Sequence, residues 1–268
     1  MSLLRRTAAV ILGITFALTL VAGLVAPAPY AQQFRDSPNA APSAAHPLGT
    51  DALGRDLLSR LLYGTRVSLL LAPAAALLST LLAALLGGAA GILGGWCERV
   101  VLAAADLFLA LPWLFLLLTV RAMLPLEVPS LVSVMVTFLM LGLLGWPASV
   151  RVVCVAARGI KESDYLLLAR SSGCKPARLL LRHVLPNLRP IFFAQFWVSI
   201  PLFILTEANL SMLGLGVMEP TPSWGNLLRG LEDFSNVSAS PWKLVPLVLL
   251  VVVVMCFQLI LPSQEVAQ

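Results

Sequence analysis

The sequence predicts an all-α, polytopic membrane protein with six transmembrane helices. Of its 268 residues, 59% are apolar and 12% are charged, and the mean hydropathy is +0.92. A soluble domain of ordinary composition has about 45–50% apolar and about 25% charged residues. A transmembrane helix needs roughly 20 mostly apolar residues, and six stretches meet that requirement. They lie at residues 8–26, 67–93, 100–120, 130–150, 191–213 and 244–262.

The first stretch, 8–26, follows Arg5 and Arg6 and so shares features with a secretory signal peptide. Its apolar core of about 19 residues is longer than the usual 7–15 of such a peptide. Pro29 also stands directly after the position where cleavage following Ala28 would occur. We therefore expect an uncleaved span.

The distribution of basic residues predicts the orientation. Eight of the 18 basic residues lie between positions 151 and 190, and Arg5, Arg6 and Arg99 would share their side if the N-terminus is cytoplasmic. The seven basic residues of the other side are balanced by acids. Because cytoplasmic loops carry an excess of Lys and Arg, both termini are expected in the cytoplasm. The formal charge of +5 is then a topology signal, and a nucleic acid is not expected as a partner.

The outer loop at 27–66 begins rich in Pro and Ala and is expected to be ordered towards its end.

The second predicted span of the chain, which follows this loop, carries Gly87, Gly91 and Gly95 at intervals of four residues. Small residues at this spacing let helix backbones approach closely in a membrane. We therefore predict that these three glycines are helix-packing residues.

Two acidic residues fall inside predicted spans. Ionisable residues in a membrane usually face a bundle interior or a watery cavity. For Asp106 in the third span, a hydrogen-bonded packing role is the favoured interpretation. Glu207 in the fifth span forms a polar stripe with Asn209 and Ser211. This stripe is a candidate lining of a translocation path, and the alternative is that it joins two subunits.

The cytoplasmic segment 151–190 is too long for a connection without structure of its own. Gly173 can end one short helix, and Pro176 suits the first turn of a second helix that carries Arg178 and Arg182 on one face. Two interpretations stay open on physical grounds. The hairpin either lies on anionic lipid or docks a cytosolic partner.

The outer loop at 214–243 contains several glycines and prolines and two tryptophans, which indicate a compact cap near the membrane interface. No Gly-Lys dipeptide occurs anywhere, so a phosphate-binding loop is absent from the sequence. The two histidines and four cysteines lack the spacing of metal ligands. We therefore predict a chain that is not an enzyme, with no catalytic residue, cofactor or metal of its own.

Four sequence blocks carry a more specific signal. Residues 46–64 read HPLGTDALGRDLLSRLLYG, 106–112 read DLFLALP, 164–173 read DYLLLARSSG, and 205–226 read LTEANLSMLGLGVMEPTPSWGN. In this order they resemble the inner-membrane permease subunit of the dipeptide, oligopeptide and nickel ATP-binding-cassette importers. The resemblance implies the fold of a type I importer permease, with cytoplasmic coupling helices and an ordered outer loop.

The resemblance also implies which residues couple the chain to an ATPase. The coupling motif falls in the 151–190 segment, although its usual glutamate is replaced here by Leu167. The resemblance therefore implies docking to the ATPase without any salt bridge from that glutamate. The implied coupling residues are Asp164, Tyr165, Ala169, Gly173, Arg178, Arg182, Leu185 and Pro186.

As such a permease, residues 1–268 would form one transmembrane domain and half of a translocation path in a bacterial inner membrane. The implied partners are a second homologous permease, two cytosolic ATPase subunits that hold ATP and Mg, and an extracytoplasmic substrate-binding protein. Peptides are the expected substrate because they are the commoner substrate of the family. A nickel chelate or another small solute is the alternative.

A rival from another class is a proton-coupled secondary transporter that uses Asp106 and Glu207. It predicts inverted repeats with broken helices in corresponding halves, and the sequence shows no such symmetry.

Overall fold

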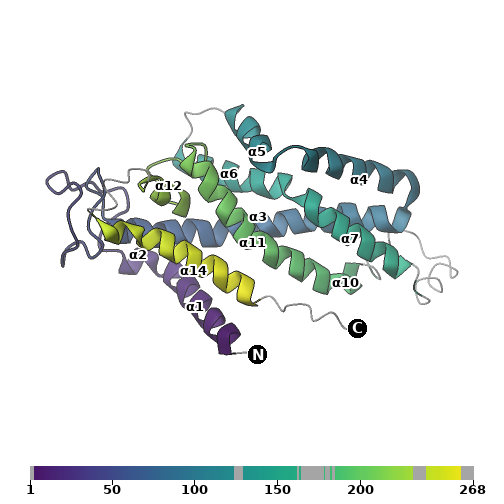
Figure 1. Ribbon diagram of the computed structural model, residues 1–268, viewed down its shortest axis with the longest axis horizontal. Helices are drawn as coiled ribbons and strands as arrows, with labels where there is room; N and C mark the ends of the chain where they lie inside the picture. Colours follow the sequence, from purple (N-terminus) through teal and green to yellow (C-terminus); the bar gives the residue numbers. More distant parts are fainter. Residues whose placement is uncertain are drawn as a thin grey trace. The chain divides into compact units, whose positions relative to one another are not determined.

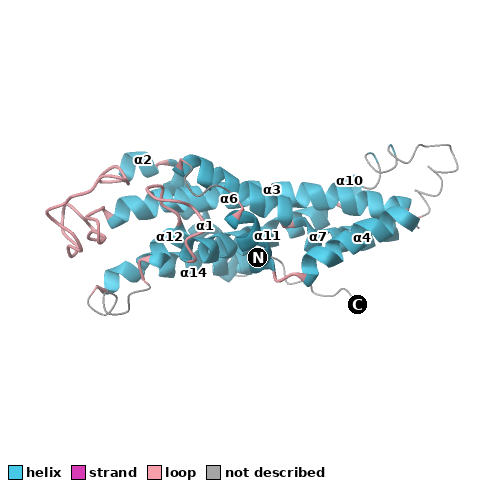
Figure 2. Cartoon of the chain, turned by 90° about the horizontal axis from the view of Figure 1, so that it is seen from above, coloured by secondary structure: helices cyan, strands magenta, loops and turns pink. Residues whose placement is uncertain are grey.

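The computed structural model describes residues 3–123, 129–161, 163, 178, 182, 185–231 and 240–260. Within these ranges the chain consists of helices and loops, and its only β-type pairings are two isolated bridges, Gln33 with Arg55 and Thr50 with Asp56. Figure 2 shows the helices joined by loops. The predicted all-α, polytopic fold is confirmed.

Five helical segments of the described chain are long and apolar enough to cross a membrane. A sixth is available if the bent pair α4 and α5 counts as one span. The five are α1 (Leu3–Leu20), α3 (Leu57–Leu93), α6 (Ser130–Leu144) with α7 (Trp146–Lys161), α11 (Arg189–Met212), and the 3₁₀ turn η2 (Pro241–Leu244) with α14 (Val245–Ile260).

The third span differs from the continuous helix predicted over 100–120. Helix α4 (Gly95–Ala110) ends before Pro112, and α5 (Trp113–Ala122) leaves at an angle of 86°. Leu111 has an extended backbone with φ −83° and ψ 134°. Proline disfavours the helical conformation in the residue before it and cannot donate a backbone hydrogen bond. The apolar pattern continues across this position, but the backbone does not.

The second span begins ten residues earlier than the predicted position 67. Asp56 immediately precedes α3, and its Oδ2 accepts hydrogen bonds from the N–H and the Oγ–H of Ser59 at 2.7 Å. A carboxylate in this position satisfies an N–H group that the first turn of a helix leaves free. The helix therefore starts within the charged sequence that was assigned to the outer loop.

Contacts divide the chain into two compact units. The first comprises residues 1–72, 121–138 and 201–268, and the second comprises 73–120 and 139–200. In the first unit α1 packs along α14, as Figure 1 shows, and the short helices α2 (Ala22–Val25) and α12 (Trp224–Arg229) contact α1 and α14 respectively. This unit holds the sequence of the predicted cap and all of the predicted outer loop at 27–66.

In the second unit α4 packs along α7. Small and branched side chains fill the contacts: Ala83, Ala105 and Val150 form one buried cluster. A second buried cluster comprises Ile92, Val153, Ala157 and Leu188, the last of which follows the short helix α10 (Leu185–Asn187).

Candidate functional site

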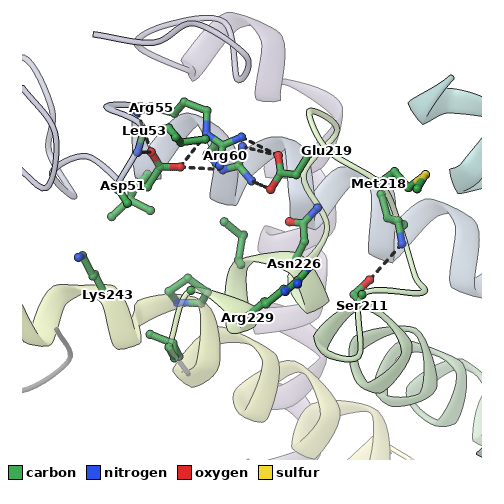
Figure 3. A pocket seen from close by; sticks show the side chains of 18 of the residues that line it. Asp51, Leu53, Arg55, Arg60, Ser211, Met218, Glu219, Asn226, Arg229 and Lys243 are labelled. Carbon is green, nitrogen blue, oxygen red and sulfur yellow. Dashed lines mark hydrogen bonds and ion pairs between the residues drawn. The ribbon is translucent and has the colours of Figure 1, made fainter. Parts of the chain in front are cut away.

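The first unit contains a cleft of about 660 Å³, shown in Figure 3. Its walls come from the loop before α3, the first turns of α3, the segment from Ser211 to Leu231, and the turn that opens α14. Both acidic and basic side chains line the cleft. The charged residues are Asp51, Arg55, Arg60, Glu219, Arg229 and Lys243.

One wall of the cleft is shaped by a tight turn at Asp51. The Asp51 Oδ1 accepts hydrogen bonds from the N–H groups of Leu53 and Arg55, both at 2.9 Å. Gly54 within this turn has φ +72°, and a Cβ there would lie 2.2 Å from the carbonyl oxygen of Phe34. Only glycine fits such a position without strain. The turn brings the Arg55 Nε to 2.7 Å from Asp51 Oδ2.

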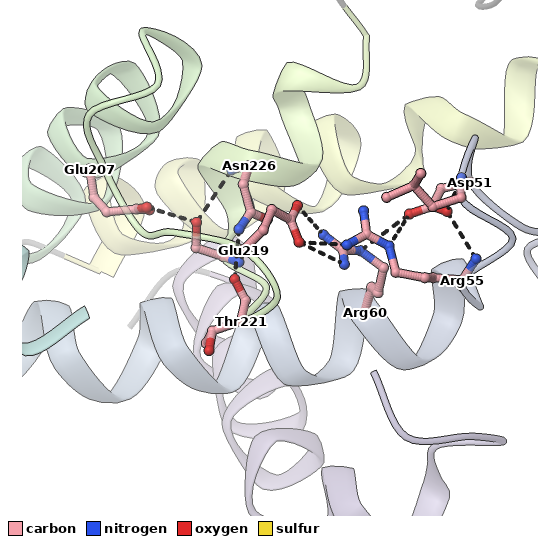
Figure 4. Close-up of polar contacts among 9 residues, drawn as sticks. Asp51, Arg55, Arg60, Glu207, Glu219, Thr221 and Asn226 are labelled. Atoms are coloured by element: carbon pink, nitrogen blue, oxygen red, sulfur yellow. Dashed lines mark hydrogen bonds and ion pairs between the residues drawn. The ribbon is translucent and has the colours of Figure 1, made fainter. Parts of the chain in front are cut away.

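Glu219 closes this wall from the other end of the chain, as Figure 4 shows. Its Oε2 accepts from Arg55 Nη1 at 2.6 Å and from Arg60 Nη1 at 3.1 Å, while Oε1 accepts from Arg60 Nη2 at 2.8 Å. The Arg60 side chain is only 2% exposed, whereas that of Glu219 is 48% exposed. Two parallel bonds from one guanidinium to one carboxylate are strong and geometrically specific.

Sequence reasoning missed this charged cluster. Arg55 and Arg60 lay in a block that carried the family resemblance, but no role was assigned to them. Arg60 and Glu219 are 159 positions apart, so no local spacing rule connects them. The available signal was weak: both arginines sit where an apolar helix begins, and such charges need a partner if they are buried.

Of the predicted polar stripe, two residues come together and one does not. Glu207 is fully buried, and its Oε1 accepts hydrogen bonds from Ser211 Oγ at 2.6 Å and Ser223 Oγ at 2.7 Å. Ser211 also reaches the cleft wall. Asn209 is exposed on another face of α11. The structure thus joins Glu207 and Ser211 to the cap at Ser223.

The cap is fastened by a helix N-terminus. Ser223 caps α12 reciprocally with Asn226: its Oγ accepts the Asn226 N–H at 3.3 Å, and the Asn226 Oδ1 accepts the Ser223 N–H at 3.0 Å. This capping box satisfies two backbone donors. A Cβ on Gly225 would lie 2.5 Å from the Cβ of Ser211, so α12 sits directly on α11.

Trp224 ties the same cap to α3. Its side chain is fully buried, its Nε1 donates to Thr65 Oγ1 at 2.9 Å, and its backbone N–H donates to Ser68 Oγ at 3.3 Å. A buried indole usually finds such a partner for its N–H. The cap therefore has a fixed position over the start of α3, within reach of the charged cluster.

Arg121 holds the turn that leads into the cap. Arg121 is 1% exposed, and its guanidinium donates to the carbonyl oxygen of Leu215 and to Ser133 Oγ, both at 2.9 Å. Ser133 Oγ in turn donates to the carbonyl oxygen of Gly216 at 3.2 Å. Within the described residues no carboxylate pairs with Arg121. A buried cation thus fixes the backbone that precedes Glu219.

The glycines predicted to pack helices lie in the second unit and divide into two cases. A Cβ on Gly87 would come 2.7 Å from the carbonyl oxygen of Val150, and one on Gly91 would come 2.6 Å from that of Cys154. Both carbonyls belong to α7, so α3 and α7 touch at their backbones. Gly95 differs from the expectation: it lies beyond the end of α3, and a Cβ there would meet nothing within 4 Å.

Two ion pairs connect α4 and α7 in the second unit. Asp106 pairs with Arg151, and their side chains are 57% and 50% exposed, respectively. A second pair joins Glu98 of α4 to Arg158, which lies in α7 seven residues after Arg151. The expected packing role of Asp106 is replaced by a pair on the surface of this unit.

The coupling residues are only partly described. Asp164, Tyr165, Ala169 and Gly173 lie outside the described residues. Arg178 and Arg182 are exposed, and half-buried Leu185 and Pro186 open α10. Among the described residues, no three His, Cys, Asp or Glu side chains gather as metal ligands.

Comparisons with known proteins place these features in a family context. Residues 79–263 match the family described as binding-protein-dependent transport system inner membrane component. A Brucella suis protein named as a peptide permease is 33% identical over 76% of the chain and 66% of its own length. The oligopeptide transport system permease protein OppC of Mycobacterium tuberculosis is 32% identical over 81% of the chain and 73% of its own length. The chain thus spans about two thirds of the length of the Brucella relative.

Proposed function

The chain belongs to the family of binding-protein-dependent transport system inner membrane components, and from that premise we propose that it forms half of the translocation path of a peptide importer. It is a multi-pass membrane protein of a transporter rather than an enzyme. The single observation that carries peptides as the substrate is that relatives from Brucella and Mycobacterium bear the names of peptide and oligopeptide permeases.

The proposed assembly contains two permeases, two ATPase subunits and a binding protein outside the membrane. The family description supports a binding protein, and the lack of a phosphate-binding loop in this sequence supports separate ATPase subunits that hold ATP and Mg. We further propose that Glu207 and Ser211 contribute to the path, because Ser211 reaches the cleft and Glu207 is bonded to it.

In the proposed coupling, the 151–190 segment docks on the ATPases through Arg178, Arg182 and their neighbours. The exposure of both arginines supports this role, because a docking surface must be free of contacts within its own chain. The high density of basic residues in the segment supports a cytoplasmic position.

The test of function is an uptake assay with labelled tripeptide in vesicles that contain the assembled transporter and its binding protein. Wild-type vesicles are expected to accumulate peptide only with ATP. Gly173→Val is expected to abolish uptake while leaving membrane insertion and pairing with the second permease intact, because the sequence predicts a left-handed helix C-cap at this glycine, which a β-branched residue would strain. Leu167→Ala is the matched control and should be milder.

Two outcomes would refute parts of this proposal. If wild-type vesicles take up no peptide, the substrate class is wrong. If Gly173→Val transports at the full rate and keeps its ATPases, the 151–190 segment is a lipid-surface element and the coupling assignment is wrong.

Orientation is tested separately by labelling in a cysteine-free background. Ser238→Cys should react with a membrane-impermeant maleimide added outside, and Lys161→Cys should not. The reverse pattern would overturn the proposed cytoplasmic position of both termini.

A further inference from the structure

The charged wall of the cleft combines two arginines and two carboxylates of very unequal burial. The Arg60 and Arg55 side chains are 2% and 10% exposed, and Asp51 is 18% exposed. Glu219 lines the same cleft, and its side chain is 48% exposed. We call the two guanidinium groups of Arg55 and Arg60 the arginine fork. Figure 3 shows the hydrogen bonds that join the fork to the Glu219 carboxylate.

The internal charge balance makes the fork dependent on a carboxylate at the Glu219 position. Asp51 is held within its own turn and contacts Arg55 at 2.7 Å but Arg60 Nε only at 3.7 Å. Without Glu219, two buried guanidinium groups would share one carboxylate. Leaving a buried charge without a partner is strongly unfavourable, so Glu219 can leave the fork readily only if another carboxylate replaces it.

The rest of the cleft suits a ligand that brings such a carboxylate. Its volume of about 660 Å³ falls in the range of small-molecule sites. Arg229 and Lys243 line it too, and neither pairs with a carboxylate of the described chain. The Lys243 Nζ donates to the amide oxygen of Asn39 at 2.9 Å. Apolar lining from Leu53, Val217 and Leu231 supplies contact for side chains.

We propose that the arginine fork is a carboxylate-binding site that Glu219 occupies in the unliganded chain, and that the C-terminal carboxylate of a short peptide displaces it. This inference rests on the proposed peptide transport and adds a binding site on the permease itself. Glu219 acts as an internal competitor. It keeps the buried arginines neutralised while the cleft is empty and yields to a ligand with the same chemistry.

The test measures peptide binding to the assembled transporter without the binding protein. Trialanine and its C-terminal amide are the two probes, each radiolabelled and brought to equilibrium by dialysis against the complex in lipid nanodiscs. The free acid is expected to bind about tenfold more tightly than the amide, which is the scale of one charge-assisted hydrogen-bond pair. This comparison needs no variant and is independent of folding defects.

Two variants sharpen the test. Glu219→Gln removes the internal competitor but keeps the size of the side chain, so the Kd of the free acid should fall about tenfold, while that of the amide stays unchanged. Asp36→Asn is the matched control, because it removes an exposed acid of the same unit that lies outside the cleft. It should leave both constants unchanged. Co-purification with the ATPases checks that each variant assembles.

Equal binding of acid and amide in the wild type, or no response of the free acid to Glu219→Gln, would overturn the proposal. So would an acid preference that appears only when the binding protein is present, because the carboxylate would then be recognised elsewhere. If vesicle uptake of tripeptide succeeds while dialysis shows no preference, only the fork proposal fails. If uptake itself fails, the proposed function fails first.

Discussion

The two units of this chain hold their parts together by different physical means. In the first unit, buried polar side chains connect segments that are far apart in sequence: Arg60 reaches Glu219, Trp224 reaches Thr65, and Glu207 reaches Ser223. In the second unit, α3 meets α7 through backbone contacts at Gly87 and Gly91, and the ion pair between Asp106 and Arg151 is half-exposed. Specific polar bonds fix a cap over a cleft, whereas small residues let two helices approach closely.

The difference has a functional consequence. Hydrogen bonds and ion pairs are directional, and removing one partner leaves the other buried without a hydrogen-bond or charge partner. In such an interaction, a ligand group of the same chemistry can replace one of the two side chains. A contact between glycine and a backbone carbonyl offers no group to exchange. The first unit is therefore suited to binding, and the second to a close and constant helix packing.

The largest effect is expected from Gly91→Leu in the second unit. The new side chain would start 2.6 Å from the Cys154 carbonyl oxygen and the Ala157 Cβ, so α3 and α7 would have to separate. We expect a loss of about 3 kcal/mol of stability, the upper range for overpacking, read as a lower Tm of the purified complex. Gly159→Leu is the control, because a Cβ there meets nothing within 4 Å. Equal Tm values for both variants would show that the backbones do not rely on this contact.

A smaller loss is expected from Arg60→Ala in the first unit. The change removes a guanidinium that is almost fully buried and that makes two bonds to Glu219. Because Glu219 is half-exposed and can be hydrated, we expect about 2 kcal/mol, below the roughly 3–5 of a fully buried pair. Arg66→Ala tests an exposed arginine of the same helix and should change the Tm little. If Arg60→Ala and Arg66→Ala have the same Tm, the charged cluster does not stabilise the first unit.

Trp224→Phe should cost less again. It keeps one aromatic ring but a smaller side chain, and it removes the Nε1–H that donates to Thr65 Oγ1, a bond expected to contribute about 1 kcal/mol. A double-mutant cycle with Thr65→Ala separates this bond from the packing loss of the smaller ring, and its coupling energy should be about 1 kcal/mol. The exposed Trp96 provides a control through Trp96→Phe. A coupling energy of zero would mean that the cap is held by packing alone.

The smallest effect is expected from Arg151→Gln. Its ion pair with Asp106 is half-exposed, and exposed pairs contribute about 0.2–1 kcal/mol. The Tm should therefore fall by much less than in Arg60→Ala. A loss as large as that of Arg60→Ala would remove the contrast between buried charges in one unit and surface charges in the other. It would also imply that the α4–α7 surface is enclosed in the assembly.

Several elements could be predicted because they depend on local composition. The apolar stretches mark the spans, since each must satisfy its backbone hydrogen bonds internally in a membrane. The family resemblance and the all-α polytopic fold are both confirmed. The start of α12 also follows a local signal, because Ser223 and Asn226 are spaced as a capping box.

Other elements could not be predicted from the same patterns. Residues 100–120 read as one apolar run, but Pro112 breaks the helix there and turns it by 86°. Gly95 continues the glycine spacing, yet α3 has already ended at Leu93. Asn209 lies two residues from Glu207 and therefore faces away from it, since side chains share a helix face at intervals of three or four residues.

The sequence by itself determined that this protein is a membrane-embedded, all-α transporter component, because hydropathy, turn residues and motif order are local properties. Only the tertiary structure decided that Arg55 and Arg60 converge on Glu219, that Glu207 serves the cap, and that Asp106 stays on a surface. These pairings depend on which helices meet and at what register. Long-range electrostatic and hydrogen-bond partners are chosen by packing, and no spacing along the chain encodes them.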